Sequence, residues 1–239
     1  MRLLYIFIDV LLPQLEELWT GKSYHNTNHV REMILTFVKN YHNIADNYPE
    51  FMKDDTIVEL LLAIIWHDAN YTSYAATNEM RAAIDFVNKL EAMPETLRYF
   101  LADDKMRERV VNDILSTRYS NTTYDTCVQK VLHDLDWYYF SSQELLLKAE
   151  SLILEELQES GMKFSEEAIQ ARLEFYKDLL GSKRQIFVSR WMEASNKDAE
   201  ALIKERINAL AFMYVQLPKH PYMPPEFLTT NEEGEKDEE

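Results

Sequence analysis

The chain has 239 residues, a formal net charge of −16 at pH 7, four glycines and one cysteine. The length suits one large domain or two small ones, and the acidic balance argues against binding to a nucleic-acid scaffold or an anionic membrane, which needs clustered lysine and arginine. The few glycines and the absence of GxGxxG and GxxxxGK[ST] patterns exclude the common phosphate-binding loops. A single cysteine excludes an internal disulfide and fits a reducing compartment, so we expect a cytoplasmic protein.

Apolar residues recur with helical spacing along most of the chain, which predicts an all-α fold in a single domain of about ten helices. Residues 3–12 predict a buried first helix rather than a signal peptide, because Asp9 interrupts the apolar run and no small-residue cleavage site follows. We expect a first helix or helix pair over about 3–20, in which Pro13 either kinks the helix or opens its second half, and Gly21 ends it. No stretch approaches the about 20 apolar residues of a membrane-spanning helix.

The later helices are predicted from the same spacing and from capping residues. The second begins near Asn26 or Thr27 and stops before Pro49, and the third covers about 55–67 with a centre that is apolar on all sides. Further helices are expected at about 77–90, 103–117, 128–135, 142–160, 165–180, 183–193 and 196–215, and Pro94 separates the first of these from a segment at 95–101 with only a weak helical pattern. We divide the chain into a helical domain, 1–217, and an acidic tail, 218–239, which we expect to be disordered.

An adjacent His67 and Asp68 lie where the buried third helix should end, a placement that suits a metal ion because the helix holds the ligands rigid. His29 adjoins Val30 and Met33 on the apolar face of the second helix and therefore faces inward. A single inward histidine is more often a core residue with a hydrogen-bond partner. That interpretation weakens for a set of such residues.

The second polar stretch is His133-Asp134-Leu135-Asp136, on a helix that packs through Val131 and Leu132. Carboxylates buried there without a partner would cost several kcal/mol, so the stretch is either an exposed acidic patch or part of a site. Two histidines with two carboxylates suit Mn²⁺, Fe²⁺, Co²⁺, Ni²⁺, Zn²⁺ or Mg²⁺ and do not choose among them.

These residues follow the order H…HD…D, and in this the chain resembles the HD superfamily of metal-dependent phosphohydrolases. The similarity is to its small all-α group with a YHN-x-x-H segment, and it spans about residues 15–210. The matching stretches are Tyr24-His25-Asn26 with His29-Val30, Trp66-His67-Asp68-Ala69-Asn70-Tyr71, Asn78-Glu79-Met80-Arg81-Ala82-Ala83 and Asp134-Leu135-Asp136, with weaker similarity at Arg172-Leu173-Glu174-Phe175 and Glu205-Arg206-Ile207-Asn208. The resemblance implies an HD-like helical bundle.

The resemblance also implies four metal ligands: His29, His67, Asp68 and Asp134, with Asp136 as the competing choice for the last position. Two-metal members of the superfamily draw extra histidines from the interval between the HD pair and the distal aspartate. This chain has no histidine from 69 to 132. We therefore expect one divalent metal ion, which argues against the di-iron oxygenases built on the same scaffold.

The implied reaction is hydrolysis of a phosphoester or phosphoanhydride bond in a nucleotide or related small molecule, by attack of a metal-bound water. Asp68 would orient the water, and Glu79 or His25 would move protons. Arg118 would neutralise phosphate charge. We also expect Asn26 and Tyr71 to contact the substrate.

The chain departs from the family at one segment. The family usually has Thr-x-x-His between the pair and the distal aspartate, whereas this chain has Thr117-Arg118-Tyr119-Ser120. An alternative function is therefore a catalytically impaired HD-fold protein that binds a nucleotide or a partner without turnover. A third is an interaction protein in which the acidic tail matters most. Each of the three is compatible with a homo-oligomer.

Overall fold

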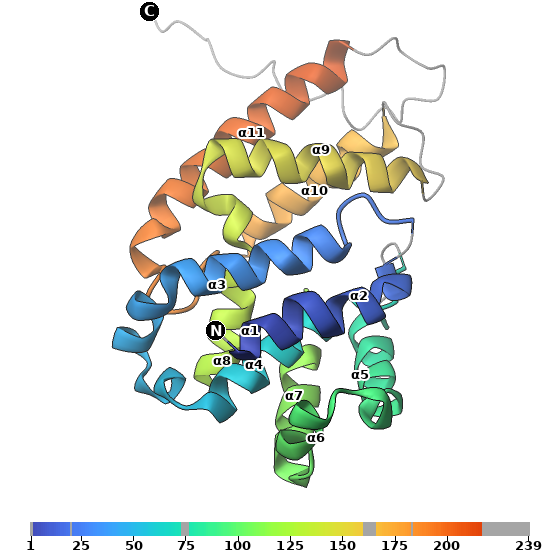
Figure 1. The fold of residues 1–239 in the computed structure, drawn as a ribbon. Helices are drawn as coiled ribbons and strands as arrows, with labels where there is room; N and C mark the ends of the chain where they lie inside the picture. Colours follow the sequence, from blue (N-terminus) through green and yellow to red (C-terminus); the bar gives the residue numbers. More distant parts are fainter. Residues whose placement is uncertain (1, 20, 73–76, 160–165, 183, 217–239) are drawn as a thin grey trace, which may run out of the picture.

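The computed structural model describes residues 2–19, 21–72, 77–159, 166–182 and 184–216. Within these ranges every regular element is a helix and none is a strand, which confirms the predicted all-α class (Figure 1). No helix in this part of the chain is long and apolar enough to cross a membrane. The predicted acidic tail, 218–239, lies outside the described residues.

The bounds of the helices agree with most of the predicted ranges. The α-helices are α1 (Arg2–Tyr5), α2 (Leu12–Gln14), α3 (Thr27–Asn47), α4 (Asp54–Trp66), α5 (Asn78–Asn88), α6 (Glu95–Leu101), α7 (Asp104–Ser116), α8 (Cys127–Asp136), α9 (Gln143–Glu159), α10 (Glu167–Gly181) and α11 (Asn196–Gln216). A π-helical turn, η1 (Ile6–Leu11), joins α1 to α2, and short 3₁₀ turns are η2 (Glu16–Trp19), η3 (Pro49–Met52), η4 (Leu90–Ala92), η5 (Tyr138–Ser141) and η6 (Glu193–Ser195).

The N-terminal segment is a helix with buried apolar residues, as predicted; Phe7, Leu11 and Leu12 are buried. Pro13 cannot donate a backbone hydrogen bond to the preceding turn, and the helix widens to π geometry just before it and ends at Gln14. Gly21 follows with a φ of 74°, in the left-handed region that favours glycine.

Helix α4 is the centre of the molecule. Every residue from 60 to 66 is 0 % exposed, because α3, α5, α7 and α8 pack around the helix (Figure 1). This confirms the predicted buried third helix. The helix ends at Trp66, so His67 and Asp68 follow directly on a segment that the core holds in place.

Helices α9, α10 and α11 lie together on one side of α3, and α4 to α7 lie on the other (Figure 1). A buried polar network joins the three C-terminal helices. The hydroxyl of Tyr176 accepts a hydrogen bond from Arg172 and donates one to Glu150, both 2.9 Å long, and Arg206 forms an ion pair with the same Glu150. Because buried polar groups are costly when unpaired, this network fixes how these helices pack.

The helix predicted at 183–193 does not form, and the described part of this segment is irregular before η6. The backbone N–H groups of Val188 and Ser189 donate hydrogen bonds of 2.8 and 3.0 Å to the carboxylate of Asp134. A helix would need those N–H groups for its own carbonyl oxygens, so a distant side chain replaces the helical bonds.

Candidate metal centre

Four side chains, from α3, from α8 and from the turn after α4, converge at the end of α4. His29 lies in the first turn of α3, His67 and Asp68 follow α4, and Asp136 is the last residue of α8. One nitrogen or oxygen of each lies within 4.8 Å of the corresponding atoms of the other three. We call these residues the four-residue group.

The two imidazoles and two carboxylates of the group alternate at short distances. Nε2 of His29 lies 3.1 Å from Oδ1 of Asp136 and 3.7 Å from Oδ2 of Asp68. Nε2 of His67 lies 2.9 Å from Oδ2 of Asp68 and 3.6 Å from Oδ1 of Asp136. The same nitrogen of each ring therefore points to the same pair of carboxylate oxygens.

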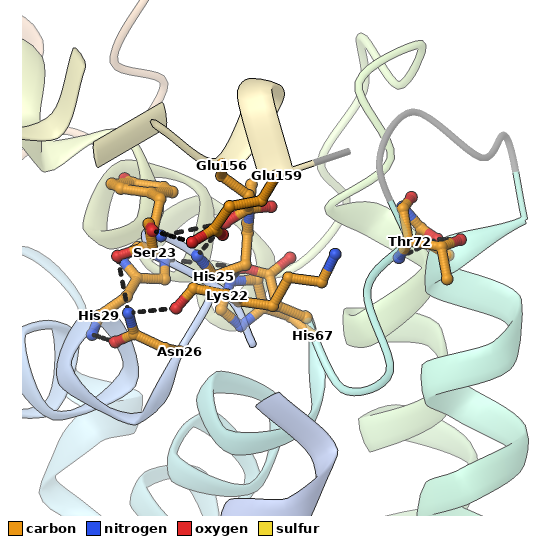
Figure 2. Close-up of polar contacts among 12 residues, drawn as sticks. Lys22, Ser23, His25, Asn26, His29, His67, Thr72, Glu156 and Glu159 are labelled. Carbon is orange, nitrogen blue, oxygen red and sulfur yellow. Dashed lines mark hydrogen bonds and ion pairs between the residues drawn. The ribbon is translucent and has the colours of Figure 1, made fainter. Parts of the chain in front are cut away.

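Asn26 caps α3 and places His29. Its side-chain oxygen accepts hydrogen bonds from the backbone N–H groups of Asn28, at 2.8 Å, and of His29, at 3.4 Å (Figure 2). Helix α3 then buries Val30 and Met33, so His29 lies on the inward face and is 8 % exposed. The predicted helix start near Asn26 is confirmed.

The backbone orients His67. Its Nδ1 lies 2.8 Å from the carbonyl oxygen of Ile64, one of the carbonyls that the end of α4 leaves without a helical partner. This contact makes Nδ1 the donor and leaves Nε2 for the carboxylates. Asn70 then adopts a φ of 55° and donates its backbone N–H to Leu18 at 3.1 Å, which turns the chain sharply after the pair.

Burial and charge oppose one another in the group. Burial raises the pKa of Asp136, but the hydrogen bond with His29 and the close imidazole of His67 outweigh it and lower that pKa. Burial also raises the pKa of Asp68, yet the charges of His67 and His25 lower it overall. Burial lowers the pKa of His67, whereas the charges of Asp68 and Asp136 raise it well above its ordinary value. The two carboxylates therefore favour a positive charge between them.

A divalent cation fits this arrangement. Nε2 of His67 and Oδ2 of Asp68 are buried and have no hydrogen-bond partner of acceptable geometry among the described residues. Mixed imidazole and carboxylate ligands are those that first-row transition metals accept. The contact of His67 with Ile64 is the outer support that metal-binding histidines usually have. The four-residue group is thus able to hold a metal ion.

The group contains Asp136 and not Asp134, which corrects the expectation for the last ligand. Asp134 is 0 % exposed, and its carboxylate accepts hydrogen bonds from the backbone of Val188 and from the N–H and hydroxyl of Ser189. Burial outweighs these bonds and raises its pKa to about 7. Residues two apart on a helix point in different directions, so only one aspartate of α8 can face His29.

His25 lies beside the group, on the segment before α3. Its Nδ1 is 2.8 Å from Oε1 of Glu156, and the backbone N–H groups of Tyr24 and His25 each donate a 3.0 Å hydrogen bond to Oε2 of the same carboxylate (Figure 2). The ring of Tyr71 stacks on His25, with centroids 3.7 Å apart and planes 14° from parallel. Tyr71 thus contacts a site residue.

Glu156, which lies on α9, was not predicted from the sequence to belong to the site. A signal was present in the sequence: Ile153 and Leu157 are buried on the apolar stripe of α9, and an acidic residue at 156 falls on the same stripe. Such a residue needs a partner in the folded protein.

Asn26 was expected to contact the substrate, but its side chain is occupied. Besides accepting two hydrogen bonds, its amide nitrogen donates to the carbonyl oxygens of Lys22, at 2.9 Å, and Ser23, at 2.7 Å. These bonds use the donors and acceptors of the amide. The structure therefore gives Asn26 a capping role.

Glu79 and Arg118 form a pair of their own outside the four-residue group. Nε of Arg118 lies 3.8 Å from Oε2 of Glu79, and both atoms are buried without a hydrogen-bond partner in the part of the chain that the structure describes. The first turn of α5 supplies the carboxylate, and the turn after α7 supplies the guanidinium. The departure segment thus faces the α5 residue predicted to be catalytic.

A groove of about 860 Å³ leads to the group between α3 and α9, with His29 and Asp136 among its lining residues. Its walls are mostly apolar and aromatic, and they carry three cationic side chains together with the carboxylates of Glu32 and Asp136. The principal lining residues are Met33, Tyr138, Tyr139, Leu145, Ala149, Leu152, Arg31, Lys39 and Lys148. The groove gives a small molecule a route to the ligand-type side chains.

Comparisons of the chain with protein-family models, with curated proteins and with solved structures each found no match. The resemblance to the HD superfamily therefore rests on the sequence motifs. The structure establishes the more general result, which is a helical protein with a buried histidine–aspartate group that can hold a metal ion.

Proposed function

We propose that the protein is a metal-dependent phosphohydrolase of the HD type, acting on a nucleotide or a related small phosphorylated molecule. The observation that supports this most is the convergence of His29, His67, Asp68 and Asp136 in the order of the superfamily motif. A divalent ion bound there would lower the pKa of a water molecule and place positive charge beside a phosphoryl oxygen.

The side chains of this protein would do the remaining chemistry. Asp68, 13 % exposed, would accept a hydrogen bond from the attacking water and hold it in line. The proton for the leaving oxygen would come from one of the polar side chains predicted for this role, His25 or Glu79.

The groove supports a substrate with an organic part next to its phosphate. Tyr138 and Tyr139 offer aromatic faces for a planar ring. Arg31 and Lys39 offer positive charge along the groove, whereas Lys148 forms an ion pair with Glu32, which also lines it. These two cations favour an anionic ligand at the groove, although the net charge of the whole chain is −16.

The test is phosphate release from a panel of nucleotides by protein supplied in turn with Mn²⁺, Co²⁺, Ni²⁺, Mg²⁺ and Zn²⁺. We expect His67→Ala and Asp68→Ala to lower the rate by at least about 100-fold. The matched control is His42→Ala, which removes an exposed histidine on α3. Equal activity in the wild type and both site variants would contradict the proposal.

Two observations favour a second function, in which a nucleotide binds without turnover. Arg118 faces Glu79 rather than standing alone as a cation, and Ser120 stands where the family has histidine. Calorimetric binding of a nucleotide without phosphate release under every metal condition would support this second function. Phosphate release by the wild type would exclude it.

A further inference from the structure

We propose that Glu156 is the positioning residue for His25, and that His25 rather than Glu79 donates the proton to the leaving oxygen. The second part rests on the proposed function. The first part concerns the orientation of one imidazole and can be measured without any reaction.

Glu156 holds both the backbone and the ring of His25. Its side chain is 6 % exposed, with one oxygen facing Nδ1 of His25 and the other accepting the backbone N–H of the same residue. A carboxylate only accepts hydrogen bonds, so Nδ1 must carry a hydrogen. The neutral ring is thereby held in the Nδ1–H tautomer, with the lone pair on Nε2.

The remaining nitrogen, Nε2, is the ring atom left for a substrate. The ring centroid of His25 lies 6.4 Å from that of His29, and the stacked ring of Tyr71 covers one face. The ring of Tyr71 against one face of the imidazole and the carboxylate of Glu156 at Nδ1 restrict rotation of the imidazole. His25 therefore presents Nε2 from a fixed position beside the four-residue group.

Glu79 is less suited to donate a proton. Its carboxylate faces the guanidinium of Arg118, with 3.8 Å between Oε2 and Nε, and this pair lies outside the four-residue group. Glu156 favours proton donation by His25, because a carboxylate at Nδ1 stabilises the doubly protonated ring. The position of His25 beside the group and its contact with Glu156 therefore assign the proton to His25.

His25 and Asp68 carry the protons of the proposed hydrolysis step. The oxygen of the attacking water forms a bond to phosphorus as the bond from phosphorus to the leaving oxygen breaks. The proton on Nε2 of the imidazolium passes to the leaving oxygen, and His25 remains neutral with Nδ1–H on Glu156. The proton lost by the water reaches solvent by way of Asp68, and solvent returns a proton to Nε2.

The same end of α9 supplies a matched control. Glu159 lies one helical turn beyond Glu156, is exposed, and accepts a 3.1 Å hydrogen bond from the hydroxyl of Ser23 (Figure 2). Both glutamates thus attach α9 to the segment before α3, but only Glu156 contacts His25. Glu156→Gln and Glu159→Gln remove the same charge from the same helix end.

The first experiment is long-range ¹H–¹⁵N NMR of the histidine rings, without substrate, at a pH where His25 is neutral. We expect the Nδ1–H tautomer in the wild type and in Glu159→Gln. In Glu156→Gln we expect a shift toward Nε2–H, because an amide cannot accept at both positions where Glu156 accepts. An Nε2–H tautomer in the wild type, or an unchanged tautomer in Glu156→Gln, would overturn the positioning role. Glu156→Asp, which keeps the charge, is the alternative if the glutamine variant does not fold.

The second experiment compares p-nitrophenyl phosphate, whose leaving group needs no proton, with an alkyl phosphate, whose leaving group does. We expect His25→Ala and Glu156→Gln to slow the alkyl ester by at least about 100-fold and the p-nitrophenyl ester much less. Equal losses on both esters would overturn the proton-donor role. If the wild type hydrolyses neither ester with any metal, the donor role falls, while the nucleotide panel still decides the proposed function and the NMR result still decides the positioning role.

Discussion

Nε2 of His29 lies 3.1 Å from Oδ1 of Asp136, although 107 positions separate the two residues. The contact joins the first turn of α3 to the last residue of α8, and the pair after α4 completes the group. The ligand-type atoms therefore come together only when these three helices are packed. Metal binding should be linked to folding for the same reason.

The first prediction follows from that linkage. An ion that binds only the folded protein stabilises it by about 2.7 kcal/mol at 100 times its Kd. For a protein of this size we expect a rise in Tm of about 5–10 °C for chelator-treated protein after addition of the preferred ion, measured by calorimetry. His67→Ala should abolish the rise and His42→Ala should keep it. A full rise in His67→Ala would show that the ion binds elsewhere.

The second prediction separates the two aspartates of α8. Asp136→Asn should abolish the rise in Tm with metal, because Asp136 belongs to the four-residue group. Asp134→Asn should keep that rise but lower the free energy of unfolding by about 1–3 kcal/mol, because it disturbs buried hydrogen bonds to Val188 and Ser189. Thermal unfolding with and without the ion measures both effects. The reverse pattern would return the last ligand position to Asp134.

The third prediction concerns a buried acidic pair between α4 and α7. Burial, the charge of Glu59 and a hydrogen bond with Glu59 raise the pKa of Asp113 to about 9, while Arg109 donates a 2.6 Å hydrogen bond to Glu59. The folded state therefore keeps a proton on Asp113 that the unfolded chain loses near pH 4. This group makes stability fall as pH rises from about 4 to 9, by up to about 1.4 kcal/mol per pH unit.

Asp113→Asn should flatten that dependence, since an amide is neutral at every pH in the window. Urea unfolding of the wild type and the variant between pH 5 and 8 measures the difference in slope. Asp46→Asn, at an exposed position on α3, is the control. Parallel slopes for the wild type and Asp113→Asn would mean that Asp113 is ionised in the folded protein.

The fourth prediction tests the network that joins α9, α10 and α11. Tyr176→Phe removes a hydroxyl that bonds to both Arg172 and Glu150 inside the protein. We expect the free energy of unfolding to fall by about 1–3 kcal/mol, because two buried charged groups each lose a partner. Chemical unfolding measures the change, and Tyr99→Phe, at an 81 % exposed tyrosine, should be neutral. A neutral Tyr176→Phe would mean that water replaces the hydroxyl.

Most helices could be predicted because their signals are local. The apolar face and Asn26 cap predicted α3, and the continuous apolar run predicted α4 as the central helix. The prediction of a helix at 183–193 was wrong because the groups that hydrogen-bond to the backbone of this segment belong to distant residues. Asp134 lies 54 positions before Val188, and no window of sequence contains both.

The residues of the site also fall into those that local sequence predicted and one that depended on the packing of the helices. The sequence predicted His29, His67 and Asp68 because each adjoins an apolar helical face, and adjacency is visible in the sequence. The choice between Asp134 and Asp136 depended on how α8 is rotated against α3 and α4, which the packing of Leu132 and its neighbours sets.

The sequence by itself determined the all-α class, the buried central helix and three members of the four-residue group, since helical periodicity acts over a few residues. Only the tertiary structure decided that Asp136 completes the group, that Glu79 pairs with Arg118 and that Glu156 orients His25. His25 and Glu156 are 131 positions apart. Contacts over such separations arise from the packing of whole helices, and the pattern of one segment does not encode which distant side chain will meet it.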